Sequence, residues 1–67
     1  MDVGHRLATN LRRLRLERGW SQEELADRAK RHRTFISQIE RVTKTPTIDT
    51  VDQIAQALGV KLGDLLD

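Results

Sequence analysis

Apolar residues recur at helical spacing along most of this chain. Near its start, Leu7, Leu11 and Leu14 stand at i, i+4 and i+7, which places them on one face of a helix directed toward a core. Gly19 follows, and glycine most readily adopts the left-handed conformation that ends many helices. The pattern therefore predicts a first helix over residues 3–18.

Residues 21–41 contain two shorter helical patterns separated by a polar interruption. Ser21 and Glu24 have the spacing of a capping box, and Trp20 and Leu25 have that of a hydrophobic staple. Each pattern has one apolar or small face, formed by Leu25, Ala26 and Ala29 in the first and by Ile36 and Ile39 in the second. Two short helices that cross steeply touch only at such positions. We therefore predict helices over residues 22–29 and 33–41 in a helix-turn-helix arrangement, with His32 capping the later one.

The last third of the chain predicts two more helices. Thr47 has the side chain of an N-cap, and Gly59 is a natural stop. Between them, the predicted core face consists of Ile48, Val51, Ile54, Ala55 and Leu58. A short helix over residues 62–66 follows. The predicted fold class is all-α, a compact five-helix domain, with residues 1–67 forming one domain.

Length and composition narrow the range of functions. A chain of 67 residues buries only about 60% of its unfolded surface on folding, so a partner subunit would add stability. The absence of cysteine excludes disulfides and thiolate metal sites. No apolar run approaches the roughly 20 residues that cross a bilayer, and there is no secretory segment, so we expect a cytoplasmic protein. Without a catalytic constellation or a metal-ligand cluster, we expect no enzyme activity, cofactor or small-molecule ligand.

Charge is distributed unevenly along the chain. Residues 1–48 hold 11 Lys and Arg against 6 Asp and Glu, a net charge of +5, whereas residues 49–67 hold 1 against 4, a net charge of −3. In residues 28–44 only Glu40 opposes the basic residues Arg28, Lys30, Arg31, Arg33, Arg41 and Lys44. Such a cluster is expected of a phosphate-binding face, although an ordinary solvated surface has the same pattern.

The chain resembles the Xre/Cro family of phage-repressor-like DNA-binding domains through LRRLRLERGWSQEELADRA, RTFISQIER and PTIDTVDQIAQALGV. The resemblance extends from about residue 7 to residue 66. It implies a lambda-repressor-like fold, with the second and third helices as the helix-turn-helix, and a regulator that binds double-stranded DNA. The lack of glycine at Val42, with RTFIS and the TI start of the fourth helix, is also similar to the controller proteins of restriction-modification systems. Those are free-standing dimers that activate and repress their own operon, although short phage-type repressors share most of these residues.

The predicted helix over residues 33–41 is the candidate recognition helix. Opposite its apolar face it presents Arg33, Thr34, Ser37, Gln38 and Arg41. Arg bonds bidentately to guanine, Gln bonds to adenine, and the Thr methyl touches the thymine methyl. The resemblance implies base reading by Arg33, Thr34 and Gln38, and we add Ser37 to this base-contacting set. The alternative for Arg33 is a phosphate or solvent contact. Phe35 is expected to pack at the helix edge, with contact to a base methyl as the alternative.

The candidate phosphate-contacting residues surround that helix and are Ser21, Gln22, Arg31, Arg41, Thr43 and Lys44. The helix over residues 22–29 begins with free N–H groups and a favourable dipole. The resemblance implies a backbone-contacting role for Gln22, which is otherwise a merely exposed residue. Thr43 and Lys44 belong to a loop that would lie beside the recognition helix. The resemblance also implies an ion pair between Arg15 and Glu40 that locks the first helix against the third, the alternative being two unrelated exposed charges.

Three positions depart from the family's pattern. Lys30 stands where the turn normally has glycine, so it must tolerate a positive φ or reshape the turn. Arg31 replaces a buried Val or Leu, and its stem can cover the core edge while the guanidinium reaches solvent or phosphate. Val42 replaces the glycine that follows IER. Because a β-branched residue disfavours the left-handed conformation, we expect the third helix to end differently.

The C-terminal leucines suggest an interface between subunits. Leu62, Leu65 and Leu66 exceed what so short a helix can bury, and the resemblance implies a twofold dimer contact there; the alternative places all three in the monomer core. We therefore expect a homodimer on a near-palindromic operator, with RNA polymerase as a further candidate partner. The rival interpretation is an antitoxin-like or other protein-interaction module of the same fold, which would use an apolar surface patch.

Overall fold

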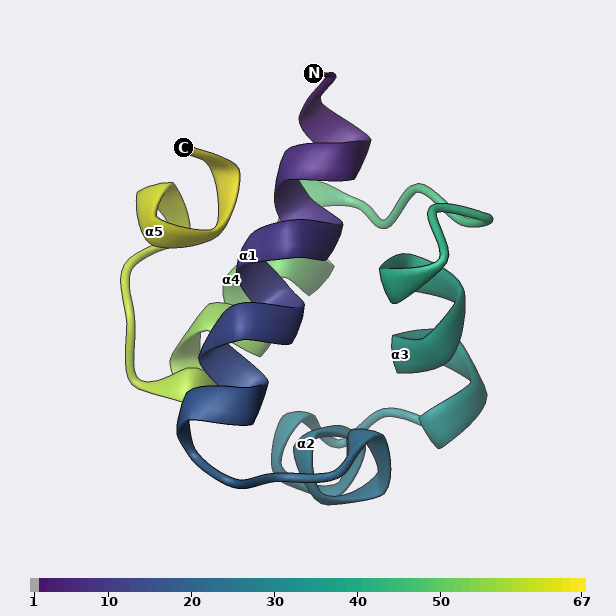
Figure 1. Ribbon diagram of the computed structural model, residues 1–67, viewed down its shortest axis with the longest axis vertical. Coiled ribbons are helices and arrows are strands. Elements are labelled where there is room, and N and C mark those ends of the chain that lie inside the picture. The colour runs from purple at the N-terminus through teal and green to yellow at the C-terminus, as the bar shows by residue number, and fades with distance from the viewer. Residues whose placement is uncertain (1) are drawn as a thin grey trace.

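The computed structural model describes residues 2–67, which form five helices (Figure 1). They are α1 (Val3–Glu17), α2 (Gln22–Ala29), α3 (Arg33–Glu40), α4 (Ile48–Leu58) and α5 (Leu62–Leu66). In Figure 1, α1 crosses in front of α4, with α3 on one side of this pair, α5 on the other and α2 at the lower end. α1 contacts α3 and α5, α2 contacts α3 and α4, and α4 also contacts α5. The prediction of an all-α, five-helix fold is confirmed.

Side chains cap the N-termini of α1, α2 and α4. Ser21 Oγ accepts a hydrogen bond from the backbone N–H of Glu24 at 3.0 Å, and Thr47 caps α4 in the same way. At the start of α1, the Asp2 carboxylate accepts from the backbone N–H of His5 at 2.8 Å. This bond lowers the pKa of Asp2 below its ordinary value because it favours the charged carboxylate. The helix starts are therefore determined locally, by residues within three positions of each other.

The core collects the apolar faces of all five helices. Its buried members are Leu7, Leu11, Leu14, Leu25, Ala26, Ala29, Ile36, Ile39, Val51, Ile54, Ala55, Leu58 and Leu65. Helices as short as α2 and α3 are not stable alone in water, so this packing holds them in place. Each large side chain contributes of order 1.5–3 kcal/mol by leaving water. The apolar faces predicted for the first three helices are all buried here.

Ile48 was expected on the core face of α4, and this prediction is wrong. It keeps 58% of its surface exposed. Ile48 is the first residue of α4 and lines the same cleft as Val3, the first residue of α1, which is itself 53% exposed. Both residues sit at the end of the helix packing, where they line an open apolar cleft instead of the core.

Leu65 was expected in a dimer interface, and this prediction is also wrong. It is fully buried within the monomer, and the Asn10 side-chain amide donates to its carbonyl at 3.0 Å. Leu62 and Leu66 are half-buried. α5 packs along α1, and this neighbour gives even a five-residue helix enough apolar surface to cover one leucine completely.

Val42 adopts the left-handed conformation that its β-branched side chain was expected to avoid, with φ of 59°. Its N–H donates to the Ile39 carbonyl at 3.0 Å, and the Thr43 N–H donates to the Gln38 carbonyl at 2.9 Å. These bonds satisfy the last carbonyls of α3 in the arrangement that glycine usually forms. The Val42 side chain also packs tightly beside Gly4, where an added Cβ would lie 3.3 Å from Val42 Cγ1.

Arginine and glutamine side chains brace the C-terminal ends of helices, a feature that the apolar pattern did not reveal. Arg18 donates to the carbonyls of Leu14 at 2.9 Å and of Leu58 at 2.6 Å, which ties the end of α1 to the end of α4. Gln53 Nε2 donates to the Ala29 carbonyl at 2.7 Å, which ties α4 to the end of α2. These bonds satisfy carbonyls that have no partner within their own helices.

Candidate nucleic-acid interface

α3 turns a polar face to solvent. Ile36 and Ile39 are fully buried on its inner side. The outer side presents Arg33 and Thr34, which are exposed, Ser37 and Gln38, which are half-buried, and Arg41, which is exposed at the C-cap. All the residues predicted to contact bases therefore share the outward face of one helix.

The turn before α3 keeps the usual helix-turn-helix geometry without glycine. Lys30 has φ of 58°, so it tolerates the left-handed conformation instead of reshaping the turn. His32 Nδ1 accepts a hydrogen bond from the backbone N–H of Thr34 at 3.1 Å. His32 therefore caps α3, as predicted, and defines where the recognition helix begins.

A buried ion pair fixes α3 against α1. Arg15 Nε donates to Glu40 Oε2 at 2.7 Å, and Arg15 Nη2 donates to Glu40 Oε1 at 3.0 Å. The two side chains keep only 10% and 5% of their surfaces exposed. Arg15 Nη1 also donates to the Trp20 carbonyl at 2.8 Å. The pair implied by the resemblance is present, and its two-pronged geometry helps to set the tilt of α3.

The N-terminus of α2 lies beside the start of α3. One surface hollow of about 490 Å³ is lined by Arg15, Ser21, Gln22, Glu23 and Arg33. This hollow brings two predicted phosphate-contacting residues next to a predicted base-contacting residue. Gln22 Nε2 donates to Glu40 Oε1 at 3.2 Å, so its amide nitrogen already belongs to the ion-pair network.

Arg31 is exposed, and its guanidinium is also bound to α4. Its Nη2 donates to Gln53 Oε1 at 2.9 Å and to Thr50 Oγ1 at 3.3 Å, both on α4. The guanidinium carbon lies 5.6 Å from the centre of the Phe35 ring. The residue as a whole stays exposed, so a phosphate contact would have to be made from this held position.

The residues that follow α3 are open to solvent. Arg41, Thr43 and Lys44 are all exposed. Thr43 Oγ1 donates to the Gln38 carbonyl at 3.1 Å, which draws the start of the loop against the end of α3. Lys44 Nζ lies 5.5 Å from the centre of the Phe35 ring, so the loop folds back along the helix. Phe35 packs against the core edge, as predicted.

Arg28 is set apart from the other basic residues of the cluster. Its Nε donates to Glu24 Oε2 at 2.7 Å, and its guanidinium carbon lies 4.2 Å from the centre of the Trp20 ring. The Glu24 carboxylate is therefore used by Arg28, while Ser21 makes the N-cap bond of the predicted capping box. The positive charge available near α3 comes mainly from Arg33, Arg41 and Lys44.

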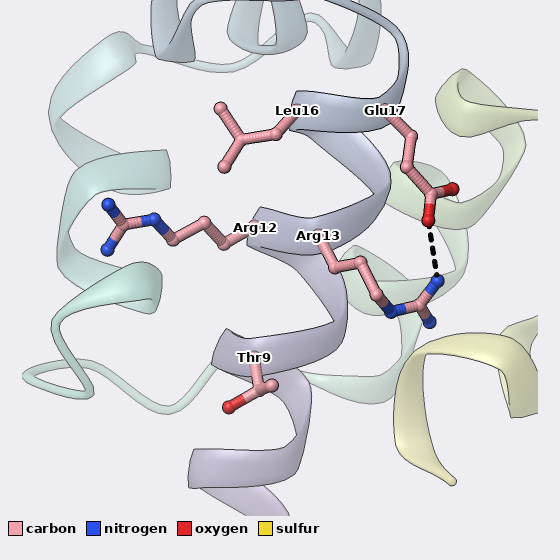
Figure 2. Close-up of a pocket in the computed structure, with 5 residues that line it drawn as sticks. All are labelled: Thr9, Arg12, Arg13, Leu16 and Glu17. Atoms are coloured by element: carbon pink, nitrogen blue, oxygen red, sulfur yellow. Dashed lines mark hydrogen bonds and ion pairs between the residues drawn. The ribbon is translucent and has the colours of Figure 1, made fainter.

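The outer face of α1 carries a second hollow (Figure 2), with a volume of about 580 Å³. It is lined by Thr9, Arg12, Arg13, Leu16 and Glu17. Arg13 and Glu17 pair at 3.2 Å, while Arg12 and Leu16 point away from that pair, and Leu16 is 56% exposed. Within residues 2–67 no group of acidic residues and histidines is placed to hold a metal ion. Over the same range, no helix has the length and apolar character needed to cross a membrane.

Comparison with known proteins decides the family. Residues 11–65 match the helix-turn-helix family HTH_3. The chain belongs to this family. It is therefore a DNA-binding transcriptional regulator and not an enzyme, and the predicted Xre/Cro-like assignment is confirmed.

Controller proteins are among the relatives of this HTH_3 regulator. Control protein C.BamHI from Bacillus amyloliquefaciens is 47% identical over 58 residues, which are 85% of this chain and 72% of the relative. Control protein C.SmaI from Serratia marcescens is 38% identical over 66 residues, 98% of this chain and 79% of the relative. A solved structure of a hypothetical transcription factor, NHTF from Neisseria, has a TM-score of 0.96 at 39% identity, covering 98% of this chain and 76% of that one. The restriction-modification controller protein C.Esp1396I has a TM-score of 0.89 at 30% identity, covering 98% and 88%.

Proposed function

We propose that this regulator binds a near-palindromic DNA operator as a homodimer, with α3 of each subunit in the major groove. The observation that supports this most directly is the outward face of α3, where Arg33 and Thr34 are exposed while the inner face is buried. A helix with its side chains is about 10–12 Å wide, and the major groove is about 12 Å wide. In a twofold dimer, the two recognition helices would enter successive major grooves about 34 Å apart.

Each base-contacting residue has a distinct proposed role. Arg33 bonds to guanine O6 and N7, Gln38 bonds to adenine N6 and N7, and the Thr34 methyl touches a thymine methyl. Ser37 lies between them on the same face and bonds to whichever base edge faces it. The position of Arg33 at the first residue of α3 supports its assignment, because the N-terminal residues of a recognition helix contact base edges in helix-turn-helix proteins.

The proposed phosphate contacts lie on both sides of α3. Ser21 and Gln22 at the start of α2 form one group, with the exposed N-terminus of that helix favouring an anion. Arg41, Thr43 and Lys44 form the other group, after the end of α3. Contacts of this kind set the register of the protein on the duplex without reading its sequence.

We propose that the second subunit docks at an apolar cleft of about 560 Å³. Its lining residues come partly from the start of α1 and the connection between α3 and α4, which lie away from α2 (Figure 1). The apolar side chains that line it are Val3, Leu7, Ile39, Val42, Pro46, Ile48, Val51 and Leu66. The exposure of Val3 and Ile48 supports a contact here, since a domain this small gains stability by covering them with its own copy. Ile39 of α3 and the residues after it, Val42, Lys44 and Thr45, also line the cleft, so a twofold axis there would bring the two recognition helices toward each other.

The proposed dimer contact thus keeps Leu66 of the three C-terminal leucines and adds Val3, Val42 and Ile48. The similarity to control proteins supports a finer proposal, in which occupancy of the operator regulates a bacterial or phage operon in the cytoplasm. The bound dimer would block RNA polymerase, or would contact it when bound just upstream of the promoter.

Selection of bound duplexes from a random pool tests the DNA-binding proposal. The wild type should enrich near-palindromic sequences. Arg33→Ala should weaken binding by about 1–3 kcal/mol and relax the preference at one base position in each half-site. Arg13→Ala, on the outer face of α1, is the matched control and should change neither the affinity nor the base preference. Enrichment that is unchanged by Arg33→Ala would remove that residue from the base-contacting set.

Sedimentation equilibrium tests the dimer proposal. Ile48→Glu should give a monomer at concentrations where the wild type is dimeric, and it should weaken operator binding. Leu16→Glu is the control because Leu16 is almost as exposed, at 56% against 58%, but lies on the outer face of α1. A monomeric wild type that shows no salt-sensitive DNA binding would instead favour the protein-interaction module.

A further inference from the structure

The edge of α3 near α4 contains a cluster that the base contacts do not use. Phe35 is half-buried at the margin of the core. The guanidinium carbon of Arg31 lies 5.6 Å from the ring centre, and Lys44 Nζ lies 5.5 Å from it. Arg31 precedes α3 and Lys44 follows it, so cations from the two ends of the helix converge on one aromatic ring.

We infer that Phe35 is a positioning residue that orients Lys44 next to the already fixed Arg31, so that the two cations bind the phosphates of one DNA strand. The inference rests on the proposed function and adds to it the organisation of one phosphate-binding edge. It assigns Arg31 a phosphate contact from the position in which α4 and the ring hold it.

The placement of the ring on α3 supports this arrangement. Successive residues of a helix are rotated by about 100°, so Arg33 and Phe35 project from nearly opposite edges of α3. Arg33 borders the hollow that contains Ser21 and Gln22. A helix in the major groove has one phosphate backbone along each edge, so these two edges would face different strands. The cluster around Phe35 therefore supplies cations to the strand that the start of α2 does not reach.

The ring acts differently on its two neighbours. Arg31 is already fixed by hydrogen bonds to Gln53 and Thr50. Among residues 2–67, Lys44 has no hydrogen-bond or ion-pair partner, so its flexible side chain is oriented by the ring. Two like charges repel each other, whereas the negative face of an aromatic ring attracts both. A cation that is held in place before binding loses less side-chain entropy when it meets a phosphate.

A double-mutant cycle on DNA affinity tests the inference, with a duplex selected by the wild type as the probe. Phe35→Leu should weaken binding about threefold to tenfold. The negative slope of log K against log salt should become shallower by about one, because one phosphate contact is lost. Lys44→Ala should weaken binding about tenfold in the wild type but less than threefold in the Phe35→Leu background. Arg41→Ala is the matched control, because Arg41 does not contact the ring, and its effect should be equal in both backgrounds. Phe35→Tyr, which keeps the ring, should restore both the affinity and the slope.

A measurement without DNA separates this inference from the proposed function. In the NMR spectrum of the free protein, the ring should shift the ε-methylene protons of Lys44 upfield, and Phe35→Leu should abolish that shift. Additive losses in the cycle, or an unshifted Lys44 signal in the wild type, would overturn the inference. A change in the selected base with an unchanged salt slope would assign the ring to base reading and would also overturn it. If the wild type binds no duplex but the upfield shift of Lys44 is present, the proposed function is contradicted, while the contact between Phe35 and Lys44 is retained.

Discussion

The turns before and after α3 share one backbone geometry but differ in what their side chains do. Lys30 and Val42 are the non-glycine residues with positive φ within residues 2–67, at 58° and 59°. In each turn, the N–H of the next residue donates to a carbonyl five positions earlier, at 2.8 Å after α2 and 2.9 Å after α3. α2 and α3 therefore end in the same way, without the glycine that usually permits it.

The side chains of Lys30 and Val42 have different surroundings. Lys30 points into solvent, so the strain of its left-handed backbone, about 1–2 kcal/mol, has little packing to offset it. Val42 is only 37% exposed, lies against Gly4 and lines the apolar cleft. The Lys30 turn only redirects the chain, whereas the Val42 turn also places an apolar side chain in the cleft. Strained backbone conformations cluster at functional sites, and the strained residue Val42 lines the proposed subunit contact.

The largest effect is expected at the end of α3 that leads into the Val42 turn. Glu40→Ala leaves Arg15 buried without its counter-ion, so the free energy of unfolding should fall by about 3–5 kcal/mol. Urea denaturation measures this change. Glu17→Ala, which removes the exposed pair with Arg13, is the control and should change stability by less than about 0.5 kcal/mol. Equal, small changes would show that the ion pair does not anchor this end of the helix.

The next largest effect is expected at the start of α3. His32→Ala removes the side-chain acceptor for the Thr34 N–H, and the free energy of unfolding should fall by about 1 kcal/mol. Amide hydrogen exchange at Thr34 should become faster at the same time. His32→Asn supplies another capping acceptor and should retain most of the stability. If His32→Ala is neutral, the contacts of Arg31 with α4 hold this turn by themselves.

Lys30→Gly should stabilise the protein. Glycine relieves the left-handed strain but gains entropy in the unfolded chain, which leaves a net gain of roughly 0.5–1 kcal/mol. Thermal unfolding should show the increase, and DNA affinity should stay within about twofold of the wild type. A lower melting temperature would mean that this turn is not strained in solution.

Val42→Gly should have the smallest effect on the monomer and is the sharpest test of the comparison. Relief of strain is offset by lost packing and by glycine entropy, so the free energy of unfolding should change by less than about 0.5 kcal/mol. The dissociation constant of the proposed homodimer should nevertheless rise, by about tenfold for a loss near 1.4 kcal/mol. Sedimentation equilibrium measures it, with Lys30→Gly as the control that leaves it unchanged. An equal response of both variants would mean that the two turns have the same role.

Helices and caps could be predicted because their causes are local. Ser21, Thr47 and Gly59 act on backbone groups within a few residues, and the leucine spacing of α1 defines its buried face without reference to any other element. The ion pair of Arg15 and Glu40 was predicted from the resemblance alone. No local rule specifies a pair separated by 25 positions.

Other positions depended on neighbours that are distant in the chain. Arg31 was expected to reach solvent or phosphate; it is exposed, and Gln53 and Thr50 of α4 also bind it, which its sequence position did not reveal. The Gln22 amide joins Glu40. Val42 accepts a strained backbone, and the absence of a side chain at Gly4 leaves room for it. Each of these outcomes follows from a contact between segments whose proximity the spacing of residues does not encode.

The sequence by itself determined the number of helices, their starts and stops, and the outward polar face of α3, because periodicity and capping act within a few residues. Tertiary structure alone decided that Leu65 is sealed in the monomer, that Ile48 faces an open cleft, and that Arg31 and Lys44 converge on Phe35. The physical reason is that burial and charge placement depend on which surfaces meet across the fold. A residue with a suitable helical position still lies in the core only if a neighbouring element covers it.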